Sequence, residues 1–280
     1  MDKVILKKWL KAGYLENEVL HTTLEGTPQG GIISPCILVM TLKGLETAIR
    51  KVARKGDKIN FISYADDFVI TGASREILEQ KVKPVIQTFL KERGLELSEE
   101  KTKVTHIDEG FDFLGFNVRK YKEKLLIKPA KTQVKEFLSN IRTIINNNKT
   151  AKAINLIWQL NPKIRGWVNY FRHVVAHKTF HRAHHFIFEA LWRWAKRRHP
   201  NKGARWVKKK YFGTYHGDRW IFYSNYVDED GQPSRSYIFK ASKTPIKRHL
   251  KIRSEANPYD PKYRDYFIQR ESRTWKAGSG

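Results

Sequence analysis

Two adjacent carboxylates, those of Asp66 and Asp67, lie at the centre of the segment INFISYADDFVITG, residues 59–72. β-Branched and aromatic residues flank them, which predicts two strands, residues 59–63 and 68–71, joined by a tight turn at Ala65, Asp66 and Asp67. Like charges this close between apolar flanks are unfavourable unless a cation neutralises them. Carboxylate oxygens suit a hard divalent cation such as Mg2+. The segment therefore predicts a hairpin that holds Mg2+ at its tip, the alternative being a solvated Asp-Asp turn.

Basic side chains are distributed unevenly along the 280 residues, a length that allows one large domain or two ordinary ones. Of 54 Lys and Arg and 28 Asp and Glu, residues 1–130 hold 22 and 18, and residues 131–280 hold 32 and 10. The net charges are therefore +4 and +22. This split predicts a catalytic module joined to a module that binds a polyanion, with nucleic acid as the leading partner.

An anionic membrane surface is the competing partner for this charge. No apolar run approaches the ~20 residues of a spanning helix, and no signal peptide opens the chain, so we expect no membrane insertion. Cys36 is the only cysteine, which excludes an internal disulfide framework and a multi-cysteine zinc site and fits a reducing compartment.

A glycine-rich element, GTPQGG at residues 26–31, precedes the predicted hairpin. A helix over residues 2–13 is expected before it, and an apolar helix over residues 33–52 after it, with Ser34 as N-cap and Pro35 in the first turn. Glycines before a helix start allow backbone to approach a ligand such as phosphate closely. An ordinary turn is the alternative.

The elements that must support the carboxylates follow. An amphipathic helix is predicted over residues 76–93, where Gly94 ends it, and a turn and strand over residues 95–107. A second hairpin is predicted from residues 111–118 and 125–127.

The basic half is predicted to be a helical bundle. Helices are expected over residues 131–146, 151–160 and 180–198. A further helix is expected to begin after residue 160, with Asn161 as N-cap and Pro162 in the first turn. We expect Trp158 and Trp167 in its core. A hairpin is predicted from residues 220–226 and 236–239, and only short elements beyond Lys243.

Basic and aromatic residues alternate on the outer faces of these helices, a pattern that suits contact with RNA phosphates and unpaired bases. The candidate RNA-binding residues are Lys163, Arg165, Arg172, Arg182, Arg193, Lys196, Arg197, Arg198, Lys208, Lys209 and Lys210. Five histidines also cluster here: His173, His177, His181, His184 and His185. Their basic surroundings oppose zinc, so we expect RNA contact or packing.

Five motifs occur together in a fixed order: GTPQGGIISP, YADD, GLELSEEKTKVTHI, GFDFLGF, and LNPKIRGWVNYFRHV with the later WRWAKRRHPNKGARWVKKKYF. In this order the chain resembles the reverse transcriptases encoded by group II introns over nearly its whole length. The resemblance implies an α+β fold. A partial reverse-transcriptase palm, an antiparallel sheet with packed helices, would span residues 1–130. A basic helical thumb or maturase domain would span residues 131–212, and a basic extension with a β-hairpin residues 213–280.

The same resemblance implies roles for individual residues. Asp66 matches a direct ligand of the catalytic Mg2+ and Asp67 a partly supporting one, while Lys101 matches a lysine near the triphosphate. The nucleotide- and primer-binding positions implied by the family are Gln29, Gly30, Tyr64, Ala65, Phe113, Leu114 and Gly115. For Lys101 the alternative is an ordinary surface charge.

A metal pair of this kind needs a further carboxylate, which the family supplies from a palm strand upstream of the glycine-rich element. We expect it to be missing here, together with the fingers, because the acids before Gly26 lie in no plausible buried strand. No HNH-type endonuclease motif is found either. The chain is therefore expected to have little or no polymerase activity alone.

Three functions are compatible with these features. The first is an RNA-directed DNA polymerase and splicing maturase that uses Mg2+ and deoxynucleoside triphosphates and binds intron RNA and an RNA/DNA primer-template. The second is a non-enzymatic, RNA-binding splicing factor. The third is one half of a split reverse transcriptase completed by a separate chain with the fingers. We expect a cytoplasmic bacterial ribonucleoprotein, with an organellar origin as the alternative.

Overall fold

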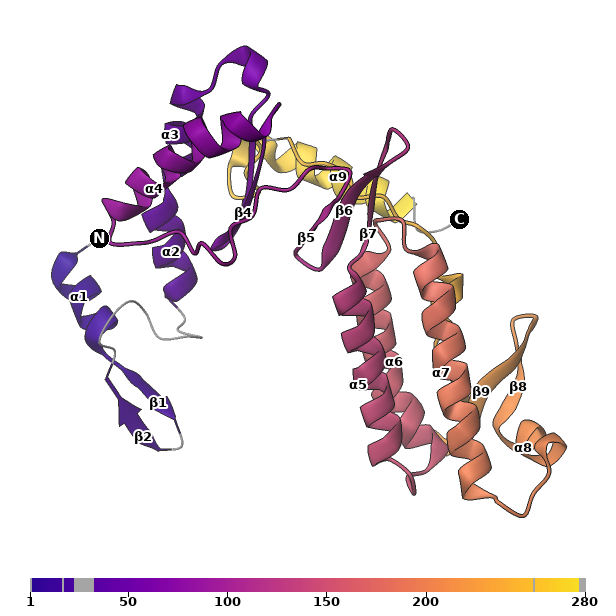
Figure 1. Ribbon diagram of the computed structural model, residues 1–280. Coiled ribbons are helices and arrows are strands. Elements are labelled where there is room, and N and C mark those ends of the chain that lie inside the picture. Colours follow the sequence, from indigo (N-terminus) through magenta and orange to yellow (C-terminus); the bar gives the residue numbers. More distant parts are fainter. Residues whose placement is uncertain (1, 17, 23–32, 254, 277–280) are drawn as a thin grey trace. The chain divides into compact units, whose positions relative to one another are not determined.

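Figure 1 shows the computed structural model, which describes residues 2–16, 18–22, 33–253 and 255–276. The chain divides into two compact units, Met1–His106 and Ile107–Gly280, and each has its own hydrophobic core. We call them the N-terminal and the C-terminal unit. Helices and strands both occur, and every strand pairing is antiparallel, which confirms the predicted α+β class. The functional domain limits at residues 130 and 212 stay a prediction.

The N-terminal unit begins with the predicted amphipathic helix. Helix α1, Lys3–Lys11, starts where the Asp2 carboxylate accepts a hydrogen bond from the Val4 N–H at 2.7 Å. Strands β1, Tyr14–Glu16, and β2, Val19–His21, then form an antiparallel pair.

The single helix predicted over residues 33–52 is in fact two helices. Helix α2 spans Ser34–Leu42 and helix α3 spans Leu45–Val52. Gly44 between them has a φ of 96°, a left-handed conformation that glycine tolerates and that interrupts a right-handed helix. Ser34 is the first residue of α2 rather than its N-cap, so that expectation was wrong.

The predicted carboxylate hairpin is present as strands β3, Asn60–Tyr64, and β4, Asp67–Thr71. The predicted helix after it begins with a π-helical segment η2, Ile77–Val82, and continues as α4, Lys83–Lys91, before Gly94. Leu45 and Ile49 of α3 pack with buried side chains of α4 to form the core of this unit. Phe61, Phe68 and Ile70 cover that core from one face of the hairpin.

No strand forms over residues 95–107, so this part of the prediction was wrong. The segment runs as turns, with the Thr102 N–H donating to the Ser98 carbonyl at 2.9 Å. Leu95 and Leu97 pack against the core of the N-terminal unit, but most of the other side chains are exposed, so the segment lacks the alternating apolar face of a half-buried strand.

The C-terminal unit opens with a three-stranded antiparallel meander: β5, Phe111–Phe113, β6, Phe116–Tyr121, and β7, Lys124–Pro129. The strand predicted over residues 111–118 is therefore broken in two. Leu114 and Gly115 form the turn, with φ angles of 49° and 76° that close a two-residue hairpin.

Three long helices form the body of this unit: α5, Lys131–Asn147, α6, Ala153–Phe171, and α7, His177–Arg198. Helix α5 packs against both others (Figure 1). Their facing sides bury apolar residues that form one continuous cluster. None of the described helices is both long and apolar enough to cross a membrane.

Helix α6 corrects the prediction that a helix ends at Leu160 and another starts at Asn161 and Pro162. It runs through both residues without a break. Pro162 lacks the N–H that would donate within the helix, while Asn161 is not a cap. The Asn161 amide instead donates to the Tyr237 carbonyl at 2.9 Å and accepts from the Phe239 N–H at 2.7 Å. The local sequence resembles a helix start, but its polar side chain serves a tertiary contact.

A second small sheet follows α8, Ala204–Tyr211. It contains β8, Phe212–Tyr215, β9, Asp218–Val227, and β10, Pro233–Tyr237, in the order β10-β9-β8. The predicted hairpin is therefore confirmed, with β8 as an additional strand. Helix α9, Arg264–Lys276, shows that the region beyond Lys243 holds more than short elements.

The two tryptophans expected in the core differ. Trp167 is partly buried and stacks on Phe137 with ring centroids 4.2 Å apart. Trp158 is 54% exposed and touches Tyr226 edge to face, so its predicted core position was wrong. Both lie on α6, and their nine-residue spacing points them to different sides of that helix.

The double hydrogen bond of Asn161 generates a stability prediction. Asn161→Ala should lower the free energy of unfolding of the C-terminal unit by about 1 to 3 kcal/mol, because a partly buried carbonyl and N–H lose their partner. Urea unfolding measures this. Asn155→Ala, at an exposed position of the same helix, is the control and should change stability by less than about 0.5 kcal/mol. Equal effects of both variants would contradict the role of the bridge.

Candidate nucleic-acid interface and carboxylate hairpin

The carboxylate hairpin is a tight two-residue turn. Tyr64 pairs with Asp67 as the last residues of the ladder, so that Ala65 and Asp66 form the turn itself. Ala65 has a φ of 52°, a conformation rarely adopted by residues other than glycine. A two-residue hairpin loop requires a positive φ at its first position, so the turn itself accounts for this conformation. The geometry sets the two carboxylates on successive residues at one end of the hairpin.

Both carboxylates are exposed to solvent, and neither forms a hydrogen bond or ion pair among the described residues. The flanking Phe61 and Phe68 turn their rings toward the core of the unit. The apolar flanks therefore do not surround the charges, and the premise that the pair needs a cation to be tolerated was wrong. Any cation bound here would be held for function rather than for stability.

The described residues do not complete a metal site. Nowhere in them do three or more His, Cys, Asp or Glu side chains gather so that they could hold a metal ion. Asp66 and Asp67 thus offer an oxygen pair that needs another oxygen donor. Lys101 is exposed in the turns after α4 and makes no contact with either aspartate within the described part. Gln29 and Gly30 lie outside the described residues.

The predicted primer-binding residues Phe113, Leu114 and Gly115 belong to the C-terminal unit. The Leu114 carbonyl accepts a hydrogen bond from the Tyr170 hydroxyl of α6 at 2.8 Å. The Gly115 carbonyl accepts one from the Ala130 N–H at 2.9 Å. This turn is therefore fixed within the C-terminal unit, whereas Asp66 and Asp67 belong to the N-terminal unit.

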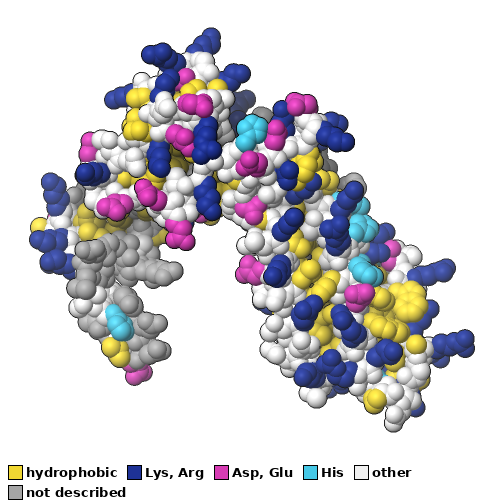
Figure 2. Space-filling model, viewed as in Figure 1, with side chains coloured by type: hydrophobic (Ala, Val, Ile, Leu, Met, Phe, Trp, Pro, Cys, Tyr) yellow, Lys and Arg dark blue, Asp and Glu magenta, His cyan; other side chains and the backbone are white. Residues whose placement is uncertain are grey.

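The candidate RNA-binding residues are spread over α6, α7 and α8, and most are exposed. Figure 2 shows Lys and Arg side chains over much of this face of the C-terminal unit, while acidic side chains are few there. Lys163 and Arg165 lie on α6, Arg182 and Lys196 on α7, and Lys208 to Lys210 on α8.

Three of the predicted residues donate hydrogen bonds within the protein, among them Arg193, whose Nε donates to the Glu189 carbonyl on the same helix at 3.3 Å. Arg198 donates to the Ala151 carbonyl at 2.6 Å and the Lys149 carbonyl at 3.2 Å, and so holds the connection between α5 and α6. Arg172 donates to Asn169 at 3.3 Å. The guanidinium groups of Arg198 and Arg172 are less available to a phosphate than those of exposed neighbours, although their assigned role stays a prediction.

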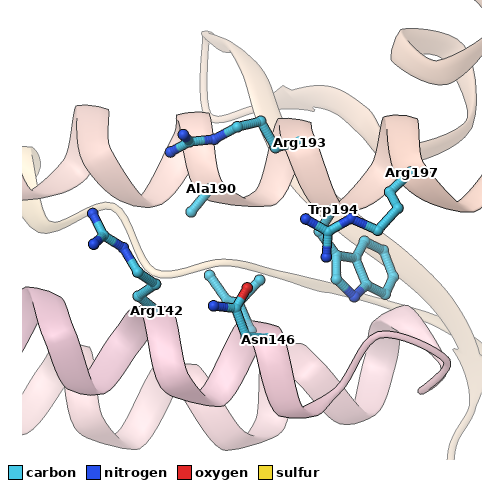
Figure 3. A pocket seen from close by; sticks show the side chains of 7 residues that line it. Arg142, Asn146, Ala190, Arg193, Trp194 and Arg197 are labelled. Carbon is cyan, nitrogen blue, oxygen red and sulfur yellow. The ribbon is translucent and has the colours of Figure 1, made fainter.

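A groove of about 190 Å3 lies between α5 and α7. Figure 3 shows Arg142 on α5 facing Arg193 and Arg197 on α7, with Ala190 and Asn146 between them. None of the three arginines forms an ion pair in the part of the chain that the structure describes. Guanidinium groups recognise phosphate oxygens through pairs of parallel N–H donors. This arginine groove can therefore take one or more phosphate groups.

The polar groove residues Arg142 and Asn146 were not among the sequence candidates. They stand four residues apart, which is the spacing of neighbours on one helix face. That spacing marks them as a pair, but only the packing of α5 against α7 shows which basic residues they meet.

The histidines of α7 have different surroundings. The described residues hold no three-ligand metal cluster here either. The rings of His177 and His181 lie 4.5 Å apart, and His185 pairs with Glu189. Burial, and next the charges of Lys240 and His181, lower the pKa of His184 to about 4. His184 is therefore neutral at physiological pH.

Comparison with known protein families agrees with this architecture. Residues 1–118 match the model of the reverse transcriptase (RNA-dependent DNA polymerase) family, and residues 134–212 match the maturase-specific domain of group II introns. The chain belongs to the group II intron reverse transcriptase and maturase family. The maturase match covers α5 to α8 and so includes the arginine groove.

Three relatives illustrate the family relationship. Group II intron-encoded protein LtrA of Lactococcus lactis subsp. cremoris is 24% identical over 255 residues, which covers 60% of this chain and 43% of that protein. Protein YkfC of Escherichia coli is 27% identical over 188 residues, with coverages of 56% and 47%. The ribosomal operon-associated A protein of Euglena longa is 28% identical over 137 residues, with coverages of 48% and 26%. The alignments thus span less than half the length of these relatives.

The low pKa of His184 generates a pH prediction. In the unfolded chain its pKa returns to about 6.5, so the unfolded state binds a proton between about pH 6.5 and pH 4 that the folded state does not. Its contribution to stability is fully present above about pH 6.5 and is lost as the pH falls toward 4. The groups that face it are His181 and His185 on α7, Lys240 near η3, Ala241–Lys243, and Asp218 at the start of β9.

Urea unfolding between about pH 7 and about pH 5 tests this prediction. The free energy of unfolding should decrease less on acidification in His184→Gln than in the unmodified protein, whereas His185→Gln, at an exposed position, should behave like the latter. NMR titration of the His184 ring with a pKa near 6.5 would contradict the prediction.

Proposed function

We propose that this chain binds the structured RNA of a group II intron through its C-terminal unit and assists the splicing of that RNA. Support comes from the maturase-specific match over residues 134–212 and from the net charge of +22 over residues 131–280. A surface of this charge releases counterions from nucleic acid on binding, which drives association.

The observation that carries this proposal is the arginine groove. Three guanidinium groups from two helices line one depression and lack carboxylate partners among the described residues. Gathering like charges in this way opposes folding unless an anion is bound. The backbone of a folded RNA supplies such anions at fixed positions, so that a rigid groove can select a shape as well as a charge.

The carboxylate hairpin supports a second part of the proposal. Asp66 and Asp67 would hold Mg2+ together with a third carboxylate and the phosphates of a deoxynucleoside triphosphate. Tyr64 and Ala65 would lie beside the primer end, Gln29 and Gly30 against the template pair, and Lys101 near the triphosphate. Phe113, Leu114 and Gly115 would contact the primer of an RNA/DNA primer-template.

Because the described residues lack a third carboxylate beside this pair, we propose that the 280-residue chain does not polymerise by itself. Its place would be in a bacterial cytoplasmic or organellar ribonucleoprotein, acting as a splicing factor.

A split reverse transcriptase is the second candidate function, and one observation favours it. Helix α2 is almost wholly apolar, yet none of its residues is buried, and Val39 is 62% exposed. Ile62 on the hairpin is 56% exposed as well. An apolar helix normally lies inside a protein. A separate chain that carries the fingers and the missing carboxylate would cover these side chains.

RNA binding across a salt series tests the maturase proposal. The chain should bind a structured group II intron RNA more tightly than a random-sequence RNA of equal length. Replacing Arg142, Arg193 and Arg197 by Gln should weaken binding to the intron RNA about tenfold or more and reduce the salt slope by about 2, as expected for three lost phosphate contacts.

The control removes the same charge elsewhere. Lys7, Lys8 and Lys11 of α1 are exposed, and their joint replacement by Gln should weaken binding much less. Equal losses for both triple variants, or no preference for intron RNA, would show a non-specific polyanion surface and refute the proposal.

Polymerase activity is tested by nucleotide incorporation on an RNA template with a DNA primer and Mg2+. We expect the 280-residue chain to give no more product than its Asp66→Ala variant. Incorporation that Asp66→Ala abolishes would refute the proposed inactivity and would show that residues outside the described part complete the site. Activity that appears only after a second, fingers-containing chain is added would establish the split enzyme.

A further inference from the structure

A second depression in the C-terminal unit, distinct from the arginine groove, combines several features of a ligand site. It has a volume of about 590 Å3, within the range of cavities that hold small molecules. Helix α7 forms one wall with His184 and Phe188, and β9 forms another with Arg219 and Trp220. Residues near η3, among them Lys240 and Lys243, form the rim. We call it the Trp220 cavity.

Trp220 reaches the cavity through an irregular stretch of β9. Gly213 pairs with Ile221 and Tyr215 with Asp218, so β9 carries one residue more than β8 in this interval and forms a bulge. Trp220 lies in this bulge with a φ of 63°, an outlier for so large a side chain. Bulges and strained residues recur beside binding sites, where they re-aim a side chain. Regular pairing would give Trp220 another direction.

The indole ring is supported from behind and remains accessible. It contacts the rings of Trp192, Phe188 and Phe212 with centroids 5.8, 6.3 and 6.4 Å away. The Lys208 ammonium lies 4.1 Å from its centroid. Even so, Trp220 is 40% exposed. A rigid aromatic face of this kind is a stacking platform for a nucleic-acid base.

His184 provides a directional polar group in the same cavity. Its Nδ1 is buried and has no hydrogen-bond partner among the described residues. The ring is neutral at physiological pH, so it presents one donor and one acceptor nitrogen. The edge of a nucleic-acid base carries both hydrogen-bond acceptors and donors, which can pair with the donor and acceptor nitrogens of a neutral imidazole.

The rim is basic, and its positive charges are only partly neutralised. Asp218 pairs with Lys240 at 2.6 Å and with Lys243 at 3.3 Å, which leaves one of these two charges uncompensated. Arg219 is exposed and forms no ion pair in the described part of the chain. An aromatic platform, the neutral imidazole of His184 and a cationic rim match a base and its phosphate.

We propose that the Trp220 cavity receives one unpaired nucleotide of a bound RNA, with its base on Trp220 and His184 and its phosphate at Arg219 and Lys243. This rests on the proposed RNA-binding function and adds a second site to it. The arginine groove would hold paired regions through their backbone, and the Trp220 cavity would select a bulged or looped nucleotide.

The test compares two RNA hairpins that differ by one nucleotide, one fully paired and one with a single-uridine bulge. The full-length chain should bind the bulged RNA about five- to tenfold more tightly, as expected for stacking of one base. Trp220→Ala should remove this preference and leave the affinity for the paired RNA unchanged. Trp220→Phe, which keeps an aromatic face, should retain most of it.

Trp206 offers a matched control. It is 38% exposed on α8 with Lys210 4.8 Å from its ring, but it does not line the cavity. Trp206→Ala should therefore keep the preference for the bulged RNA. A photoreactive thiouridine at the bulge should crosslink to the peptides that contain His184 or Trp220, a readout that needs no variant to fold.

The outcomes separate this proposal from the function on which it rests. Equal binding of both RNAs by the unmodified protein, crosslinks outside the cavity, or a preference that survives Trp220→Ala would overturn the nucleotide site. If one of these outcomes is found but the arginine-groove variant still loses affinity for both RNAs, the nucleotide site is wrong and the maturase proposal is kept. Binding of free uridine monophosphate without any preference between the RNAs would assign the cavity to a small molecule and also overturn the proposal.

Discussion

Repulsion among like charges is the constraint on which the C-terminal unit depends. Residues 131–280 carry a net charge of +22, and this charge opposes compaction at every separation shorter than the screening length. Burial of apolar side chains opposes this repulsion. The apolar cluster is shared by α5, α6 and α7, and in it Leu160, Ile164 and Leu191 are fully buried. Cation–π contacts stabilise some of the cations, since Arg198 lies over Trp194 and Lys208 over Trp220. Tryptophan rings thus stabilise some of the cations in this half, and an anionic partner would relieve the remaining repulsion.

Periodicity predicted most of the elements because the apolar spacing in this chain is regular. Helices α1, α5 and α7 and the hairpins at Asp66 and at residues 228–231 follow directly from it. The errors occur where the same residue type is compatible with two different local structures. Asn161 before Pro162 reads as a helix start, yet its amide binds the backbone beside β10. Gly44 and Gly115 look like tolerable interruptions of longer elements, yet their positive φ angles divide a helix and a strand. Local propensity cannot show which alternative a residue takes when the deciding partner lies some seventy residues away.

Site prediction reached a similar limit. The exposed basic residues of α7 and α8 were found from composition, but convergence across helices depends on packing. Arg142 meets Arg193 and Arg197 only because α5 lies against α7. Conversely, Arg198 is occupied by the connection after α5, which its sequence neighbours do not reveal. The Trp220 cavity depends on a bulge that no residue-type pattern predicts, since the position would ordinarily call for glycine.

The division into two cores has a functional consequence. Asp66 and Asp67 are supported by α3 and α4, while the turn of Leu114 and Gly115 is fixed to α6 by Tyr170. The carboxylates and the predicted primer contact therefore belong to units that fold around separate apolar clusters. Nucleotidyl transfer requires both to be held within a fraction of an ångström of one geometry, whereas the proposed RNA contacts lie in the C-terminal unit alone. Under the proposed function, RNA binding by the C-terminal unit would not depend on the state of the carboxylate hairpin. The proposed splicing assistance would therefore be less sensitive to changes in the N-terminal unit than the proposed nucleotidyl transfer.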